Sequence, residues 1–376
     1  MEIIARKRNK LLSLLLLLVT LATTGYGQDA DWALGPFERP EGVNPIITPS
    51  EKATFYCPMR DSLLHWEAMA TFNPAAVVRD GKVHVLYRAE DLTGTMKIGG
   101  HTSRIGMALS DDGLHFDRLG KPVLYPADDD QKQYEWPGGT EDPRIVETES
   151  GTYVMTYTQW NGETPRLAVA TSDDLKNWEK HGPAFEEAYG GKYHDMHTKS
   201  GAILSRREGD HLVATRVNGM YWMYWGVPTV HLAKSEDLVN WTPVENERGE
   251  LKPVLAPREG YFDSWLVEAG PPALITDRGI VVVYNAGNDG KSGDPSIPDS
   301  VYTGGQVLYD LEQPSRLIDR LDKPFIQPEK DYEKSGQYKS GTTFLEGLVH
   351  FRDRWFIYYG TADSRVAVVV SDPGKE

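Results

Sequence analysis

The phrase ALSDDGLHF at residues 108–116 returns as ATSDDLKNW at 170–178 and as AKSEDLVNW at 233–241. In each copy a serine precedes two acidic residues and, further on, an aromatic residue, and successive serines are 62 and 63 residues apart. Two weaker copies, Leu308–Leu311 and Val370–Asp372, continue this spacing to the end of the chain. A regular period of this length indicates a repeated supersecondary unit.

Two further sequence elements recur five times in the same order. One is a run rich in β-branched and aromatic residues, found at Val83–Ala89, Tyr153–Trp160, Tyr221–Gly226, Ile280–Gly287 and Trp355–Gly360. Ahead of each run lies a short strand-like segment, at Asn73–Arg79, Asp142–Glu147, Ser200–Arg206, Gly270–Thr276 and Gly347–Phe351. Such runs are typical of β-strands. Each repeat therefore contains a strand, a turn, an aromatic strand, a loop and a further strand that ends in the Ser-Asp turn.

This order predicts an all-β fold, a five-bladed β-propeller. Each blade of a propeller buries its faces against its neighbours, and the ring leaves few exposed strand edges. We expect a single domain over residues 28–376, in which residues 28–72 form an N-terminal arm that packs against the ring or helps to close it. The alternative is a pair of β-sandwiches with chance Ser-Asp turns, since both residues are ordinary turn formers.

The acidic composition limits the partners of the protein. The chain has 376 residues, with 40 Lys and Arg against 55 Asp and Glu, and a formal net charge of −15. Partners held through phosphate neutralisation require a basic surface, so we expect neither nucleic acid nor an anionic membrane surface. The sequence has no Gly-rich phosphate loop and no nucleotide-binding fingerprint, which gives no support for a cofactor. Cys57 is the only cysteine and cannot form an intramolecular disulfide.

Residues 1–27 have the pattern of a secretory signal peptide. Four basic residues between positions 6 and 10 precede the apolar run Leu11–Ala22, and small residues follow up to Gly27. The apolar run is too short to span a bilayer core of about 30 Å. We therefore expect cleavage near Gly27, export to the periplasm or the extracellular space, and no membrane insertion of the mature chain.

Polar residues at the starts of the first strands are the candidates for chemistry. In a propeller the first strand of each blade lines the central channel, so Asn73, Asp142, Lys199 and Glu268 should converge there. Two carboxylates across one funnel fit glycoside hydrolysis, which uses an acid for the leaving oxygen and a second carboxylate for water or the sugar. Asn-Pro and Asp-Pro are also common turn starters, so a structural role for Asn73 or Asp142 alone stays open.

Aromatic residues near these positions favour a sugar ligand. Rings of this kind can stack on the apolar faces of sugars, although core packing is the usual role of any single ring. The candidates are Trp66, Trp136, Trp160, Tyr221, Trp222, Tyr224, Trp225 and Trp265. His194, Asp195 and His197 lack further ligands at a recognisable spacing, so we predict no metal site.

At several of these positions the sequence resembles glycoside hydrolase family 130, the mannoside phosphorylases and related β-mannosidases. The matching phrases run in order along the chain: Phe72–Ala75 (FNPA), Leu86–Ala89 (LYRA), Ser103–Gly106 (SRIG), Glu141–Ile145 (EDPRI), Ala269–Pro272 (AGPP) and Tyr358–Asp363 (YYGTAD). The resemblance implies a five-bladed propeller, which agrees with the repeat count.

The resemblance also implies residue roles. Asp142 would be the proton donor, acting through the 3-hydroxyl of the mannose at the cleavage site. The phrases that contain Asn73, Arg88, Arg104, Lys199 and Asp363 are similar to those that line that mannose subsite.

Two departures from the phosphorylase pattern indicate hydrolysis. Family phosphorylases carry a His-Arg pair at the end of the third aromatic strand, and the arginine helps to hold phosphate. The corresponding stretch of this chain is Met223–Gly226 (MYWG), which includes Tyr224 and Trp225. The chain also has Glu268 where phosphorylases have glycine, and a carboxylate there would repel phosphate but could activate water. Export favours the same interpretation, because a sugar phosphate is of little use outside the cytoplasm. We therefore expect an inverting exo-β-mannosidase that acts on β-1,2-linked mannooligosaccharides, with Asp142 as the acid and Glu268 as the base.

Two alternatives remain at this point. The first is a mannoside phosphorylase whose phosphate site uses other cations, such as Arg216 or His197. The second is a non-catalytic glycan-binding propeller. For the hydrolase we expect a bell-shaped pH profile, with an acidic limb from Glu268 and a basic limb from Asp142.

Overall fold

The computed structural model describes residues 30–94 and 99–371. Regular structure in these ranges is almost entirely strand, and the helical segments are the short α1 (Lys132–Glu135) and the 3-10 turn η1 (Asp331–Glu333). The all-β prediction is therefore confirmed. The expected signal peptide, residues 1–27, lies outside the described residues. No helix within the described ranges has the length and apolar character needed to cross a membrane.

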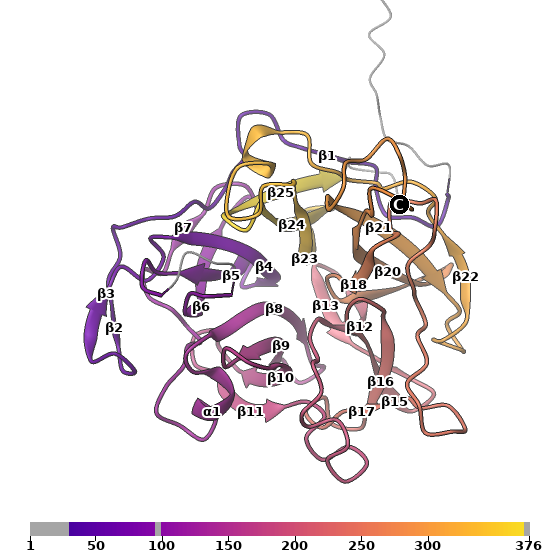
Figure 1. Ribbon diagram of the computed structural model, residues 1–376, viewed down its shortest axis with the longest axis horizontal. Coiled ribbons are helices and arrows are strands. Elements are labelled where there is room, and N and C mark those ends of the chain that lie inside the picture. The colour runs from indigo at the N-terminus through magenta and orange to yellow at the C-terminus, as the bar shows by residue number, and fades with distance from the viewer. Residues whose placement is uncertain (1–29, 95–98, 372–376) are drawn as a thin grey trace, which may run out of the picture.

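The strands follow one another along the chain in groups of antiparallel neighbours, which fan out around a common centre (Figure 1). The first group is β4 (Ala70–Arg79), β5 (Lys82–Glu90), β6 (Ser103–Ser110) and β7 (Asp117–Arg118). The second is β8 (Gly139–Glu147), β9 (Tyr153–Trp160), β10 (Pro165–Ser172) and β11 (Glu179–Pro183). The third is β12 (Gly201–Glu208), β13 (His211–Ala214), β14 (Arg216–Val217), β15 (Met220–Trp225), β16 (His231–Ser235) and β17 (Thr242–Pro243).

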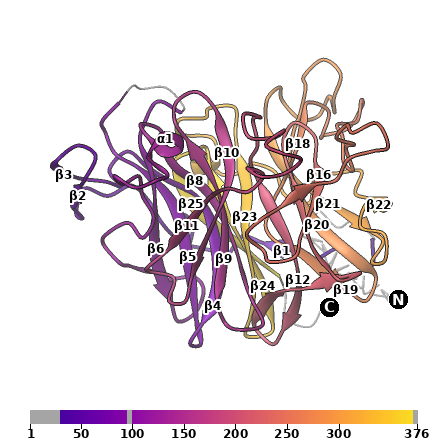
Figure 2. The ribbon, with the colours of Figure 1, turned by 90° about the horizontal axis from the view of Figure 1, so that it is seen from below.

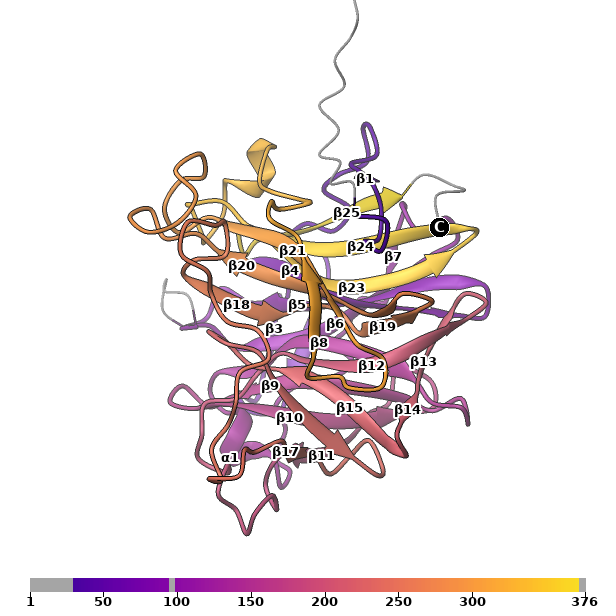
Figure 3. The ribbon, with the colours of Figure 1, turned by 90° about the vertical axis from the view of Figure 1, so that its right-hand side faces the viewer.

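The fourth group is β18 (Leu266–Ala269), β19 (Ala273–Thr276), β20 (Gly279–Gly287), β21 (Tyr302–Tyr309) and β22 (Leu317–Arg320). The fifth is β23 (Thr343–Phe351), β24 (Arg354–Thr361) and β25 (Arg365–Ser371), and β1 (Phe37–Glu38) from the N-terminal segment pairs with β25 at its outer edge (Figure 3). A separate hairpin contains β2 (Phe55–Cys57) and β3 (Ser62–Leu64).

The five aromatic runs of the sequence are strands β5, β9, β15, β20 and β24, and each observed boundary lies within one residue of the expected one. The third repeat departs from the expected order, because two short strands lie between its first strand and its aromatic strand. Strand β13 forms a hairpin with β12, and β14 forms a hairpin with β15. The fourth repeat departs as well. Its first strand is split into β18 and β19 around Pro271 and Pro272, which have no N–H to donate to a sheet ladder.

The Ser-Asp phrases form one type of turn. Asp112 Oδ1 accepts hydrogen bonds from the backbone N–H groups of Leu114 and His115, and the N–H of Gly113 donates to Ser110 Oγ. The turns at Ser172 and Ser235 repeat these bonds with Asp174 and Asp237. These side chains satisfy backbone donors that would otherwise have no partner in a tight turn.

Five hydrophobic clusters each join two neighbouring strand groups. They connect the first group with the second, the second with the third, the third with the fourth, the fourth with the fifth, and the fifth with the first. The last contact includes Val85 of β5 and Val368 of β25. The first strands of the groups, β4, β8, β12, β18 and β23, lie nearest the centre (Figure 1). Seen from the side, the groups stand beside one another, with α1 near one end of the strands (Figure 2).

Candidate active site

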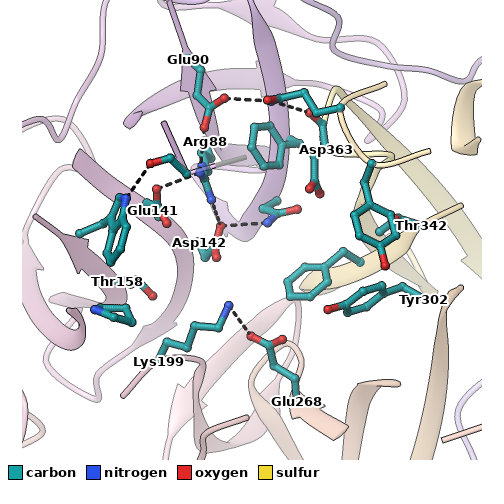
Figure 4. A pocket seen from close by; sticks show the side chains of 18 residues that line it. Arg88, Glu90, Glu141, Asp142, Thr158, Lys199, Glu268, Tyr302, Thr342 and Asp363 are labelled. Carbon is teal, nitrogen blue, oxygen red and sulfur yellow. Dashed lines mark hydrogen bonds and ion pairs between the residues drawn. The ribbon is translucent and has the colours of Figure 1, made fainter. Parts of the chain in front are cut away.

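A cavity of about 330 Å³ opens where the inner strands converge. Strands of the first, second, fourth and fifth groups contribute residues to its lining. No strand of the third group does, but Lys199, which lies just before β12, lines the cavity. The volume is within the range of sites that hold small ligands. Charged side chains such as Glu268 and aromatic side chains such as Tyr302 share the wall (Figure 4), and the Arg88 guanidinium lies over the Phe72 ring.

Local backbone irregularities direct Asn73 and Asp142 into this cavity. The pairing register of β4 and β5 shifts at Asn73, and that of β8 and β9 shifts at Asp142. Both residues have left-handed backbone angles, with φ of 45° and 50°. A bulge turns a side chain away from the regular alternation of the strand, and Asn and Asp tolerate the left-handed conformation better than most residues. Strain of this kind is frequent at functional sites.

Arg88 joins three carboxylates in one network. Its Nη2 lies 2.7 Å from Glu90 Oε1 and 2.8 Å from Glu141 Oε1, and its Nη1 lies 3.1 Å from Asp142 Oδ1. All four side chains are buried. A planar guanidinium can donate to several carboxylates at fixed angles, so Arg88 holds Asp142 and Glu141 in a defined orientation.

Asn73 and Lys199 complete the polar wall. Asn73 Nδ2 donates to Asp142 Oδ1 over 2.8 Å, while its Oδ1 has no hydrogen-bond partner in the described part of the chain. That oxygen is buried and packs against Gly360, where a Cβ would lie 2.2 Å from it, so Asn73 holds Asp142 rather than offering a free acceptor. Lys199 Nζ lies 3.3 Å from Glu268 Oε1, and the Ser200 hydroxyl also donates to Glu268 (Figure 4).

The carboxyl groups of the cavity differ in proton affinity. Burial raises the pKa of Glu141 to about 7 and that of Asp363 to about 7, against the lowering effect of Arg88. Burial acts on Asp142 as well, but Arg88, Lys199 and the Asn73 hydrogen bond outweigh it and lower the pKa of Asp142. Below about pH 7 the protons of this cluster therefore reside on Glu141 and Asp363 rather than on Asp142. This differs from the expectation that Asp142 itself titrates on the basic limb.

Six of the nine residues predicted from the sequence line the cavity: Asn73, Arg88, Asp142, Lys199, Glu268 and Asp363. Arg104 does not, because its buried guanidinium pairs with Asp91 over 2.7 Å behind the wall. Tyr224 and Trp225 also lie elsewhere, since β15 is not an inner strand. The Tyr224 hydroxyl donates to the carbonyl of Pro314, and Trp225 packs on Phe185 with ring centres 4.6 Å apart. Because Trp225 does not line the cavity, its position does not support the prediction that it replaces a phosphate-binding arginine there.

The sequence interpretation missed several lining residues. Glu90 could have been found, because it follows Arg88 by two positions in one strand and must share its face. Gln337 donates to Glu90 Oε2 over 2.9 Å, and both it and Tyr338 come from an irregular segment with no sequence pattern. Tyr302 lies at the start of β21, outside the motifs considered.

A cavity lined by converging carboxylates and by aromatic rings is typical of carbohydrate-active enzymes. The family model described as β-1,4-mannooligosaccharide phosphorylase matches residues 50–373 of this chain. The chain belongs to glycoside hydrolase family 130, whose members act on glycosides as phosphorylases or as hydrolases.

Relatives of both kinds are similar to this chain. A 1,2-β-oligomannan phosphorylase of Thermoanaerobacter is 33% identical over 309 residues, which are 81% of this chain and 90% of that protein. One similar solved structure is described with the statement that the GH130 family of mannoside phosphorylases contains glycoside hydrolases that target β-1,2 mannosidic linkages in Candida mannan. It is 53% identical, with a TM-score of 0.90, and the match covers 91% of this chain and 95% of that one. A glycosyl hydrolase of Bacteroides ovatus is 53% identical with a TM-score of 0.89, over 91% and 95% of the two chains.

Proposed function

We propose that this protein is an exported, inverting exo-β-mannosidase that hydrolyses β-1,2-linked mannooligosaccharides. Asp142 acts as the acid and Glu268 as the base. The observation that carries this proposal is the charge of the cavity, which is suited to a sugar and to water but poorly suited to inorganic phosphate.

Acidic groups outnumber basic groups in the cavity. Among the described residues that line it, the carboxyl side chains are Glu90, Glu141, Asp142, Glu268 and Asp363, and the cations are Arg88 and Lys199. Both cations are already engaged, Arg88 with three carboxylates and Lys199 with Glu268. Even with Glu141 and Asp363 protonated, three carboxylates face two cations. Phosphate would therefore meet an uncompensated negative charge in a buried site, where repulsion between like charges is strong.

The cations suggested for a phosphate site do not line the cavity. Arg216 stacks on Tyr221 and donates to the carbonyl groups of Gly219 and Glu236. His197 is an exposed side chain in the segment before β12. Neither residue is in place to hold a phosphate next to Asp142.

In the proposed reaction one water is consumed and one glycosidic bond is broken. Glu268 removes a proton from the water, whose oxygen bonds to the anomeric carbon. The bond between the anomeric carbon and the leaving oxygen breaks. Asp142 donates a proton to the 3-hydroxyl of the mannose, and this hydroxyl passes its own proton to the leaving oxygen, as the family resemblance implies. Because the pKa of Asp142 is lowered, Asp142 receives this proton from Glu141 or Asp363 of the same cluster, whose pKa values are raised to about 7. Glu268 then releases to solvent the proton that it took from the water, and the cluster takes one proton up again. The products are mannose and a chain shortened by one residue.

We further propose that the strand groups are the blades of a five-bladed β-propeller. The cyclic succession of hydrophobic clusters and the pairing of β1 with β25 support this description. The cavity would then lie on the axis, at the starts of the first strands.

Similarity alone leaves phosphorolysis as the second candidate, because the curated Thermoanaerobacter relative is named a phosphorylase. The deciding experiment is product analysis of purified protein on β-1,2-mannobiose, with and without inorganic phosphate. We expect free mannose at equal rates in both samples, and proton NMR should detect the α-anomer first. Mannose 1-phosphate that forms only with phosphate would establish the phosphorylase. Binding without turnover would establish a glycan-binding protein.

The proposed export has a separate test. N-terminal sequencing of the protein recovered from its source should give a mature chain that begins near Gln28. An intact Met1 on the mature protein would contradict export through a cleaved signal peptide.

A further inference from the structure

Glu346 is a fully buried carboxyl group in β23, two residues after Phe344, which lines the cavity. It occupies the point in β23 where the pairing with β24 shifts register, between Leu345 and Gly347. Asn73 and Asp142 occupy the corresponding irregularities of β4 and β8. Glu346 is thus the equivalent of these residues in the fifth strand group. It does not line the cavity, and no step of the proposed reaction uses it.

Glu346 has one charged partner. Its Oε1 lies 3.0 Å from Arg144 Nη2, and neither carboxyl oxygen has a hydrogen-bond partner of regular geometry in the described residues. Burial strongly raises the pKa of Glu346, and the charges of Asp142 and Glu268 raise it further.

Arg144 connects the backbones that carry those groups. Its Nη1 donates to the carbonyl of Asp142 over 3.0 Å, its Nη2 to the carbonyl of Ala269 over 2.9 Å, and its Nε to the carbonyl of Gly270 over 2.9 Å. Ala269 directly follows Glu268 in the chain. One guanidinium therefore joins β8 at the acid to β18 at the base, and Glu346 joins the same guanidinium to β23.

Stability alone does not explain such a pair. Burial of an ion pair costs desolvation energy that its own attraction offsets only in part, and apolar replacements are often as stable. What a planar guanidinium adds is fixed geometry, because its donors point in set directions. An inverting glycosidase needs fixed geometry, since its two carboxyl groups must stand about 6.5–9.5 Å apart to admit the sugar and the water. A misplacement of roughly 1 Å can lower turnover about a hundredfold.

We propose that Arg144 and Glu346 form a buried brace that fixes the separation of Asp142 and Glu268. Both are positioning residues, because neither lines the cavity nor reaches the substrate. This inference rests on the roles that the proposed function gives to Asp142 and Glu268. Close packing around the brace supports it, since a Cβ on Gly270 would lie 2.6 Å from the carbonyl oxygen of Val283 and 3.2 Å from that of Leu345.

The test compares Arg144→Lys and Glu346→Gln with a control, Glu135→Gln. Arg144→Lys keeps the positive charge but cannot donate to the carbonyl groups of Asp142, Ala269 and Gly270 in the same arrangement. Glu346→Gln keeps the shape of the side chain but removes its carboxyl group. Glu135 is also fully buried and pairs with Lys180, but it does not line the cavity. For each protein kcat, KM and Tm are measured with the same mannobiose.

We expect both brace variants to lower kcat at least about 30-fold, with KM changed less than about threefold, because the fault lies in alignment rather than in binding. Glu135→Gln should lower Tm by a similar amount and leave kcat within about twofold of the unmodified protein. A kcat within twofold for the brace variants would overturn the proposal. If Arg144→Lys does not fold, Glu346→Gln decides alone, because it retains the native shape.

Failure of the brace can be distinguished from failure of the proposed function. Each effect is the kcat of a variant divided by the kcat of the unmodified protein. This ratio can be measured whether the products come from hydrolysis or from phosphorolysis. Loss of activity in Asp142→Asn and Glu268→Gln but not in the brace variants would refute the brace alone. Retained activity in Asp142→Asn and Glu268→Gln would refute the assigned roles.

Discussion

The ammonium group of Lys199 lies 3.3 Å from Glu268 Oε1, and its positive charge also helps to lower the pKa of Asp142. One cation therefore influences both proposed catalytic carboxylates, although these belong to different strand groups. Lys199 acts from a segment ahead of β12, so three parts of the chain meet at this contact.

Asp142→Asn should abolish turnover while ligand binding persists. The amide keeps an oxygen that can accept the hydrogen bond from Asn73, but it cannot deliver a proton. Loss of a general acid typically costs about 10²–10⁴ in rate. Rates are measured by mannose release and affinity by calorimetry with mannobiose. A variant with native turnover would show that Asp142 does not supply the proton.

Glu268→Gln should also lower kcat by about 10²–10⁴, because the amide cannot accept a proton from water. The hydrogen bond from Ser200 can persist to the amide oxygen, so the fold should tolerate the change. Glu135→Gln serves as the matched control. If added phosphate restored the rate of Glu268→Gln to the native value, Glu268 would be excluding phosphate rather than activating water.

Activity should fall as the pH rises through about 7. Glu141 and Asp363 have pKa values raised to about 7, mainly by burial, so above that pH the cluster loses the proton that the leaving oxygen requires. Glu141→Gln should move this limb to lower pH by roughly one unit, because it removes a like charge and leaves Arg88 free to act on Asp142. The measurement is kcat/KM between pH 4 and 9. An unmoved limb would show that this cluster does not control the step.

Asp363→Asn should stabilise the protein more at high pH than at low pH. The pKa of Asp363 is 3.8 without the fold and about 7 within it. Because the fold raises this pKa, the neutral carboxyl group contributes fully to the free energy of unfolding below about pH 3.8. That contribution is lost as the pH rises through about 7. The Tm difference between variant and native protein should therefore increase from pH 5 to pH 8.5. Asp111→Asn, at an exposed site, should show no such trend.

Asp112→Ala should cost about 1–2 kcal/mol of unfolding free energy, because the backbone N–H groups of Leu114 and His115 lose their acceptor. Its neighbour Asp111 makes only an exposed ion pair with Lys82, so Asp111→Ala should change stability by less than about 0.5 kcal/mol. Denaturant unfolding measures both. Equal losses would show that the repeated phrase does not stabilise its turn.

The sequence alone determined the all-β class, the bounds of the aromatic strands and the repeated turn. These features depend on alternation, propensity and side-chain bonds within a few residues, which are local properties of the chain. Position within a repeat also identified Asn73, Asp142, Lys199 and Glu268, because equivalent strand starts face a shared centre. Family resemblance added Arg88 and Asp363.

Only the tertiary structure decided which side chains reach the cavity and which lie behind it. Arg104, Tyr224 and Trp225 have the right chemistry and nearby sequence positions. The Arg104 guanidinium instead pairs with Asp91, and the rings of Tyr224 and Trp225 pack between strand groups. Glu346 has no distinguishing neighbour in the sequence, yet it meets Arg144 from a strand about 200 residues away. Such contacts depend on how the groups pack around the centre, and short-range pattern does not encode that packing. The same holds for the proton affinities of Asp142, Glu141 and Asp363, which are set by burial and by charges from several strands.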